Sequence, residues 1–176
     1  MRKSLVGLIV ALSLLLAVSV GCTVALLVAS SKPVVNTFTA GGVDITLTET
    51  TSGYKMTPGV TVLKDPTVTV LGNSEKCWLF VKIEKESNFD TFCTYEIQEG
   101  WTALEGQIDI YCQLVEKSSE NQVFPVLKNN CVLVKDTLTE EQLDAITENP
   151  TLTVTAYAIQ DDGLGTAVAA WQALNQ

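Results

Sequence analysis

Apolar and polar residues alternate strictly in several short segments of the chain. In residues 43–49, Val43, Ile45 and Leu47 alternate with polar residues, so these three side chains would share one face of a β-strand. Similar β-branched runs recur over residues 60–63, 67–71, 78–84, 94–97, 109–116, 131–134 and 152–159. Turn-forming residues separate most of them. The pattern predicts an all-β domain, and short strands at this spacing are typical of a jelly-roll-like sandwich of two antiparallel sheets.

Two segments near the C-terminus depart from this alternation and predict short helices. Thr139 and Gln142 have the spacing of a capping box, in which each side chain bonds to the backbone amide of the other, and Pro150 would stop this helix. Residues 166–174 are rich in alanine and place four apolar side chains on one helical face: Ala167, Ala170, Trp171 and Leu174. We expect this last helix to dock on the sandwich.

The N-terminus has a different pattern, because two cations precede an uncharged and mostly apolar stretch over residues 5–31. These are features of a secretory signal peptide. Thr23 and Ala25 supply the small residues that signal peptidase requires at the third and first positions before the cut. Residues 1–25 would then be the signal peptide, and Leu26 would become the N-terminus of a secreted protein.

Two other interpretations of the N-terminus stay open. Cys22 follows a glycine and could be lipidated, although Ser19 stands where a lipobox usually has leucine. The apolar stretch is also long enough to remain as an uncleaved anchor across a hydrocarbon core of about 30 Å. Cleavage would leave residues 26–42 as a flexible N-terminal segment that could act as a donor strand, ahead of a β-sandwich domain over residues 43–176.

The amino-acid composition excludes several classes of function. Without residues 1–25 the chain keeps nine Lys and Arg against 20 Asp and Glu, a net charge of −11, which makes nucleic acid a poor partner. Contact with the membrane would be limited to the signal segment before cleavage. Histidine is absent from the sequence, which excludes a histidine triad, a histidine base and the usual histidine-ligated zinc site. We therefore predict no catalytic residue, cofactor or metal ligand.

Four cysteines remain once Cys22 is removed with the signal: Cys77, Cys93, Cys112 and Cys131. An even number in an exported chain is compatible with two disulfides, in any of three connectivities. Four small buried hydrophobic residues are an equally good interpretation, and a Cys₄ zinc site is a weaker one because no CxxC pair is present.

Two further features have a functional and a structural interpretation. Asp161 and Asp162 precede a glycine and could offer oxygen ligands to calcium, but an acidic turn before a helix explains them better. Three tryptophans could form a carbohydrate platform. Trp78 and Trp171 are instead expected in the core, and Trp101 is the one expected to be most exposed.

Several short segments, in their order along the chain, carry a family resemblance. The signal ends in Gly-Cys-Thr-Val-Ala, and residues 36–49 read Asn-Thr-Phe-Thr-Ala-Gly-Gly-Val-Asp-Ile-Thr-Leu-Thr-Glu. Further segments are residues 56–59, 64–68, 78–83, 100–101 and 152–160. Together they resemble the SipW-dependent exported proteins of Gram-positive bacteria, a family that includes the biofilm matrix protein TasA and camelysin.

The resemblance implies a jelly-roll sandwich, export by a dedicated signal peptidase, and self-association or association with related matrix subunits in extracellular fibres, in the matrix or at the cell surface. In such fibres the N-terminal segment of one subunit completes a sheet of the next. The matching segment here is residues 26–39, with Val34, Val35 and Phe38 as expected anchors of the assembly strand.

Two alternative functions accompany this expectation. Camelysin is described as a metallopeptidase, so the resemblance also implies a cell-surface metallopeptidase. The lack of histidine and of an HExxH motif favours the structural role. Four cysteines in the mature chain exceed what the resemblance implies, which leaves a monomeric cell-envelope binding protein with disulfides as the other alternative.

Overall fold

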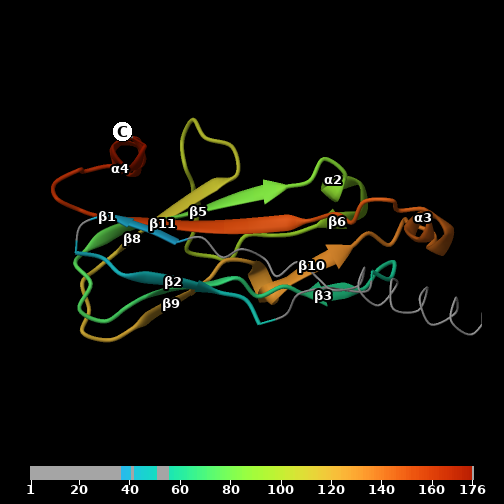
Figure 1. The fold of residues 1–176 in the computed structure, drawn as a ribbon, viewed down its shortest axis with the longest axis horizontal. Coiled ribbons are helices and arrows are strands. Elements are labelled where there is room, and N and C mark those ends of the chain that lie inside the picture. Colours follow the sequence, from blue (N-terminus) through green and yellow to red (C-terminus); the bar gives the residue numbers. More distant parts are fainter. Residues whose placement is uncertain (1–36, 41, 51–55, 176) are drawn as a thin grey trace, which may run out of the picture. The chain divides into compact units, whose positions relative to one another are not determined.

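The computed structural model describes residues 37–40, 42–50 and 56–175, and this part of the chain is mostly β-structure with a few short helices (Figure 1). All of it belongs to the unit Pro33–Gln176. The strands are β1 (Thr37–Ala40), β2 (Ile45–Thr48), β3 (Thr61–Leu63), β4 (Thr67–Val70), β5 (Cys77–Lys85), β6 (Cys93–Thr94), β7 (Thr102–Ala103), β8 (Ile110–Val115), β9 (Gln122–Pro125), β10 (Cys131–Val134) and β11 (Leu152–Gln160). The helices are α2 (Phe89–Phe92), the 3₁₀ turn η1 (Lys128–Asn130), α3 (Glu140–Asp144) and α4 (Ala167–Leu174).

The strands form one large and two smaller sheets. The large sheet has the order β1-β11-β5-β8-β7, and the smaller ones have the orders β3-β10-β6 and β2-β4-β9. β5 and β11 are the longest strands and pair antiparallel along their full length, from Lys85 opposite Leu152 to Cys77 opposite Gln160. The neighbouring strands are antiparallel in every described pair except one, because β1 runs parallel to β11.

One hydrophobic core collects buried side chains from all three sheets. β5 contributes Leu79 and Val81, β4 contributes Val68 and β10 contributes Val134, and all four are completely buried. The alternation in β2 has the predicted result, since Ile45 is buried and Thr46 is exposed. Burial of one face of each sheet is the main source of stability in such an arrangement.

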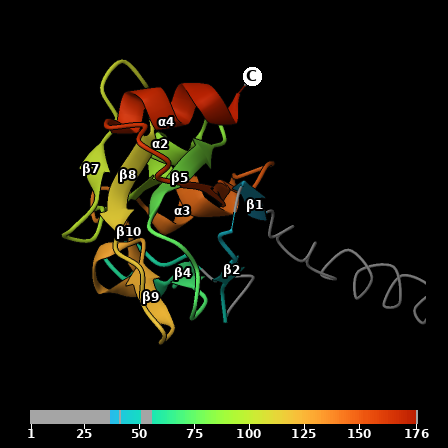
Figure 2. The ribbon, with the colours of Figure 1, turned by 90° about the vertical axis from the view of Figure 1, so that its left-hand side faces the viewer.

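The other face of the large sheet is covered by α4 (Figure 2). Phe80 of β5 alternates with Leu79 and Val81, so its ring lies on the α4 side and is fully buried in a second cluster with Ala170. Trp171 packs on it at a ring-centroid distance of 5.2 Å. The large sheet is therefore apolar on both faces along its central strands.

Both predicted helices are present, but the predicted stop of the first one at Pro150 is wrong. Thr139 and Gln142 form a complete capping box: the Gln142 amide donates to Thr139 Oγ1 and the Thr139 amide donates to Gln142 Oε1. This helix, α3, ends at Asp144, well before Pro150. α4 begins after Thr166, whose side chain accepts a bond from the Ala169 amide. Within the described ranges, no helix has the length and apolarity needed to cross a membrane.

Seven of the eight predicted strands are confirmed in position. The eighth, residues 94–97, is confirmed only at its start, because β6 ends at Thr94 and Ile97 forms an isolated bridge with Leu127. β7 and β9 were not predicted. β7 has only two residues. β9 ends in a proline and has no buried residue. Neither strand therefore shows the alternation that marks a half-buried strand.

Candidate functional site

β1 lies at the edge of the large sheet, where it pairs with β11. Thr37, Phe38, Thr39 and Ala40 are the register partners of residues 156–159 of β11, with Phe38 opposite Tyr157. The strand comes directly from the N-terminal segment that the sequence predicts as a possible donor strand. The end of that segment therefore adds a strand to the sheet of its own chain.

β11 is buried to the extent expected of a strand with neighbours on both sides. Thr155 and Val154 are buried, and Ala156 and Ala158 are fully buried, so water has little access to either face near this edge. On the α4 side, Tyr157 stacks edge-on against Trp171, with centroids 5.3 Å apart and an interplanar angle of 88°. Backbone groups beside such an apolar strand are costly to leave unpaired, and pairing with β1 satisfies them.

A set of hydrogen bonds at Gly42 marks where the chain leaves this edge. The Gly42 N–H donates to Gln160 Oε1 at 2.9 Å, and the Gly42 carbonyl accepts from the Glu75 N–H at 3.0 Å. Gln160 is held in turn, because its Nε2 donates to Asp162 Oδ1 at 2.7 Å. We call these contacts of Gly42 with Gln160 and Glu75 the Gly42 bracket. It ties the chain to the end of β11 and to the turn before β5.

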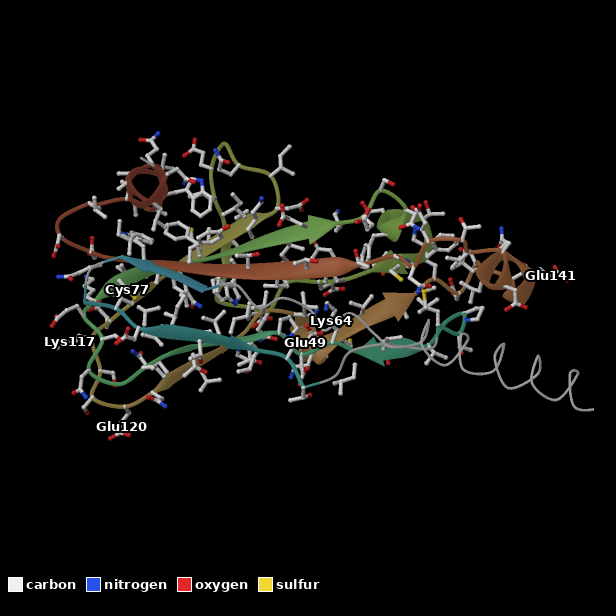
Figure 3. All side chains as sticks on the ribbon, in the orientation of Figure 1. Glu49, Lys64, Cys77, Lys117, Glu120 and Glu141 are labelled. Atoms are coloured by element: carbon white, nitrogen blue, oxygen red, sulfur yellow. The ribbon has the colours of Figure 1, made fainter. Side chains whose placement is uncertain are left out.

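The residues after Gly42 are also held by hydrogen bonds and an ion pair. The Asp44 N–H donates to the hydroxyl of Ser74 at 3.1 Å, and the Asp44 carbonyl accepts from the Leu71 N–H at 2.9 Å. Just beyond β2, Lys64 Nζ lies 2.8 Å from Glu49 Oε1, and both side chains are nearly buried (Figure 3). β2 is thus anchored to other segments at both of its ends, whereas β1 pairs with β11 and also lies beside β2.

A second candidate site is a small polar cavity of about 300 Å³ beside β6 and α2. Lys85 lines it, with Nζ 3.0 Å from Asp90 Oδ2, 3.9 Å from Asp109 Oδ2 and 5.8 Å from the ring centroid of Tyr95. Tyr111 also lines this cavity.

The electrostatics of this cavity favour a structural role. Burial, followed by the negative charge of Asp109, raises the pKa of Tyr95 well above its ordinary value, so the phenol keeps its proton and bonds to Asp109. The hydrogen bond with Asp90 raises the pKa of Lys85, which keeps the ammonium charged. The ammonium is already matched by two carboxylates and an aromatic face, and a protonated amine cannot act as a nucleophile.

All four cysteines of the described part are free thiols, so the two disulfides that the sequence leaves possible are not formed in the structure. Cys112 is the register partner of Phe80, whereas Cys77 pairs with Val115, and the two thiols lie in clusters on opposite faces of the large sheet. Cys93 pairs with Val134, three positions from Cys131. An offset of three residues places two side chains on opposite faces of a strand pair. Neither Cys77 with Cys112 nor Cys93 with Cys131 therefore has disulfide geometry.

Three of the four cysteines fit the interpretation as small buried hydrophobic residues. Cys77, Cys93 and Cys112 are buried (Cys77 is labelled in Figure 3), and Cys131 is half-buried. Burial raises the pKa of Cys77 to about 11 and raises that of Cys93 and Cys112 as well. Such thiols are poor nucleophiles and poor metal ligands at neutral pH.

The acidic turn and Trp101 have structural partners. Asp161 lies 3.8 Å from Lys76 Nζ, and Asp162 accepts the bond from Gln160. Over the described part of the chain, no three Cys, Asp or Glu side chains converge as a metal site would require. Trp101 packs against the core and donates from Nε1 to the Pro125 carbonyl at 2.9 Å, so it is less exposed than expected.

Several predicted positions lie outside the described residues. These are the cleavage-site residues Thr23, Ala25 and Leu26 and the expected anchors Val34 and Val35. Phe38 is the one predicted assembly residue that the structure places, in β1. The Gly42 bracket was not predicted, because Gly42 and Gln160 are 118 positions apart and no local pattern relates them.

Comparison of the chain with protein-family models, with characterised proteins and with solved structures finds no match in any of the three.

Proposed function

We propose that this protein is a secreted structural protein of a Gram-positive bacterial matrix, similar to TasA, that self-assembles by adding its N-terminal strand to a sheet. Its fold would be a jelly-roll-like sandwich, and its role structural rather than catalytic. A dedicated signal peptidase would release it at the cell surface, and its partners would be further copies or related matrix subunits. Cleavage near Ala25 would free the segment that carries β1.

The observation that carries the proposal is the position of β1. It forms the edge of the large sheet, it is contributed by the N-terminal segment, and its register with β11 is defined over four residues. Strand addition uses main-chain hydrogen bonds for affinity, and any chain with a compatible segment can supply them. Another copy of this protein carries the same segment, which makes it a suitable donor.

The chemistry of the chain supports a structural role over the metallopeptidase alternative. The sequence has no histidine, and the polar cavity around Lys85 has its charges matched internally. A metallopeptidase needs a metal-bound water and a base beside it. Casein digestion by the purified protein that a chelator abolishes would contradict the structural role.

The test compares the chain from Leu26 with one that lacks residues 26–39. We expect the longer protein to form fibres visible by electron microscopy and the shorter one to remain monomeric in sedimentation. A chain that lacks only residues 26–32 is the matched control, since it is shortened but keeps the complete strand. Circular dichroism checks that each variant is folded. Fibres of unchanged appearance from the chain without residues 26–39 would overturn the proposal.

A further inference from the structure

We propose that Lys64 and Asn130 become joined by an intramolecular isopeptide bond, with Glu49 as the group that moves the protons. The bond links the residue that follows β3 to the residue that precedes β10. It goes beyond the proposed function and does not depend on it, because all three residues belong to one folded chain.

Lys64 and Asn130 lie opposite each other at the end of the β3–β10 pair. Cys131 is the register partner of Leu63, and one position further the Lys64 N–H donates to the Asn130 carbonyl at 2.8 Å. Opposite residues of an antiparallel pair have Cβ atoms about 5 Å apart, a distance that a lysine side chain can span. The Asn130 backbone is left-handed, with φ 52°, so strand alternation alone does not place its side chain. Its Oδ1 is buried and has no hydrogen-bond partner, which places the amide inside the fold.

Glu49 and Lys64 extend the buried faces of their strands. Glu49 continues the alternation of Ile45 and Leu47, which are buried, and Lys64 continues that of Val62, which packs against the core. Lys64 Nζ lies 2.8 Å from Glu49 Oε1, and the two side chains are only 12% and 10% exposed (Figure 3). An amine, a carboxylate and an unpartnered amide are therefore collected at one end of the β3–β10 pair.

The burial of this ion pair is what makes the amine available for reaction. In the other described ion pairs the lysine side chain is 22% to 57% exposed. Removing two charges from water is costly, and transfer of one proton from the Lys64 ammonium to the Glu49 carboxylate leaves two neutral groups. That transfer supplies the free amine that a nucleophilic attack requires.

The reaction is balanced within the three residues. Glu49 takes a proton from Lys64, and the free amine attacks Cγ of Asn130, so that a bond forms between Nζ and Cγ. The bond between Cγ and Nδ2 then breaks. Nδ2 takes one proton from the attacking nitrogen and one from Glu49 and leaves as ammonium, and Glu49 is again a carboxylate. No electrons pass to or from another molecule, so the step needs neither an oxidant nor a reductant.

The bond acts on stability as a disulfide would. It joins two residues that are far apart in sequence, which lowers the conformational entropy of the unfolded chain. The four cysteines of the described part form no disulfide, so the isopeptide bond supplies a covalent cross-link that the thiols do not.

The test is the intact mass of the chain from Leu26, measured on denatured and reduced protein. We expect it to lie below the sequence mass by one molecule of ammonia, about 17 Da. Lys64→Arg keeps a cation beside Glu49 but has no amine that can attack, and Glu49→Gln removes the proton carrier, so both variants should have their full sequence mass. Lys128→Arg is the matched control and should keep the loss, because Lys128 pairs with Glu96 at the surface.

A second measurement does not depend on the folding of any variant. Tandem mass spectrometry of a tryptic digest of the wild-type protein should find one branched peptide that contains both Lys64 and Asn130. A wild-type protein of full sequence mass would overturn the inference. A loss of ammonia that persists in Lys64→Arg would come from ring closure at an asparagine and would overturn it as well. Neither result bears on strand addition, which is read from the fibres.

Discussion

Cys77 shows how one buried thiol makes stability depend on pH. Its side chain is completely buried, and burial raises its pKa to about 11 from an ordinary value of 9.0. The folded state therefore holds the thiol proton to a higher pH than the unfolded state does. The resulting contribution to stability is fully present below pH 9 and is lost as the pH rises through about 11.

We expect the urea midpoint of unfolding to fall between pH 9 and pH 11, and to fall less steeply in a Cys77→Ala variant. Cys93, Cys112 and Tyr95 also have raised pKa values, so the variant should keep part of the slope. Val81→Ala is the control, because Val81 is as fully buried in the same strand but carries no titrating proton, so its replacement should lower the midpoint and leave the slope unchanged. Parallel curves for wild type and Cys77→Ala would show that Cys77 does not contribute.

At the scale of elements, Trp171 is one of the side chains that attach α4 to the large sheet. Its ring contacts both Phe80 and Tyr157 at centroid distances of 5.2 and 5.3 Å. The connection from β11 contains Gly163 and Gly165 in the left-handed region, so packing rather than a rigid linker places the helix.

We expect Trp171→Ala to lower the free energy of unfolding by about 2 kcal/mol, less than a fully buried tryptophan would lose, because Trp171 is partly exposed. Gln172→Ala is the matched control on the exposed side of α4 and should change stability by less than about 0.5 kcal/mol. Both values come from urea titrations followed by far-ultraviolet circular dichroism. A loss below about 0.5 kcal/mol for Trp171→Ala would mean that α4 is not held by these ring contacts.

The elements that could be predicted from the sequence are those whose signals are local. Alternation in residues 43–49 predicted β2, and the spacing of Thr139 and Gln142 predicted the start of α3, because side-chain period and capping depend on neighbours along the chain. The Gly42 bracket, the register of β1 on β11 and the separation of the four thiols depend on residues far apart in sequence. A single sequence gives no periodic signal for such contacts.

At the scale of the whole molecule, net charge would act against the proposed assembly. The chain after residue 25 carries a net charge of −11, and the described ion pairs, such as Lys76 with Glu116, use its few lysines within the subunit. Copies that approach one another are therefore repelled at low ionic strength. Repulsion between exposed charges extends to about 30 Å at about 0.01 M salt and to about 8 Å at about 0.15 M.

The assembly strand itself is different, because residues 34–42 contain no charged side chain. Salt should consequently act on the approach of subunits and have little effect on insertion of the strand. We expect added NaCl, from about 0.01 M to about 0.15 M, to shorten the lag before the light scattering of the chain from Leu26 rises. Sucrose in place of salt is the control for effects that do not depend on charge. A lag that does not change with salt would remove charge repulsion as a barrier to assembly.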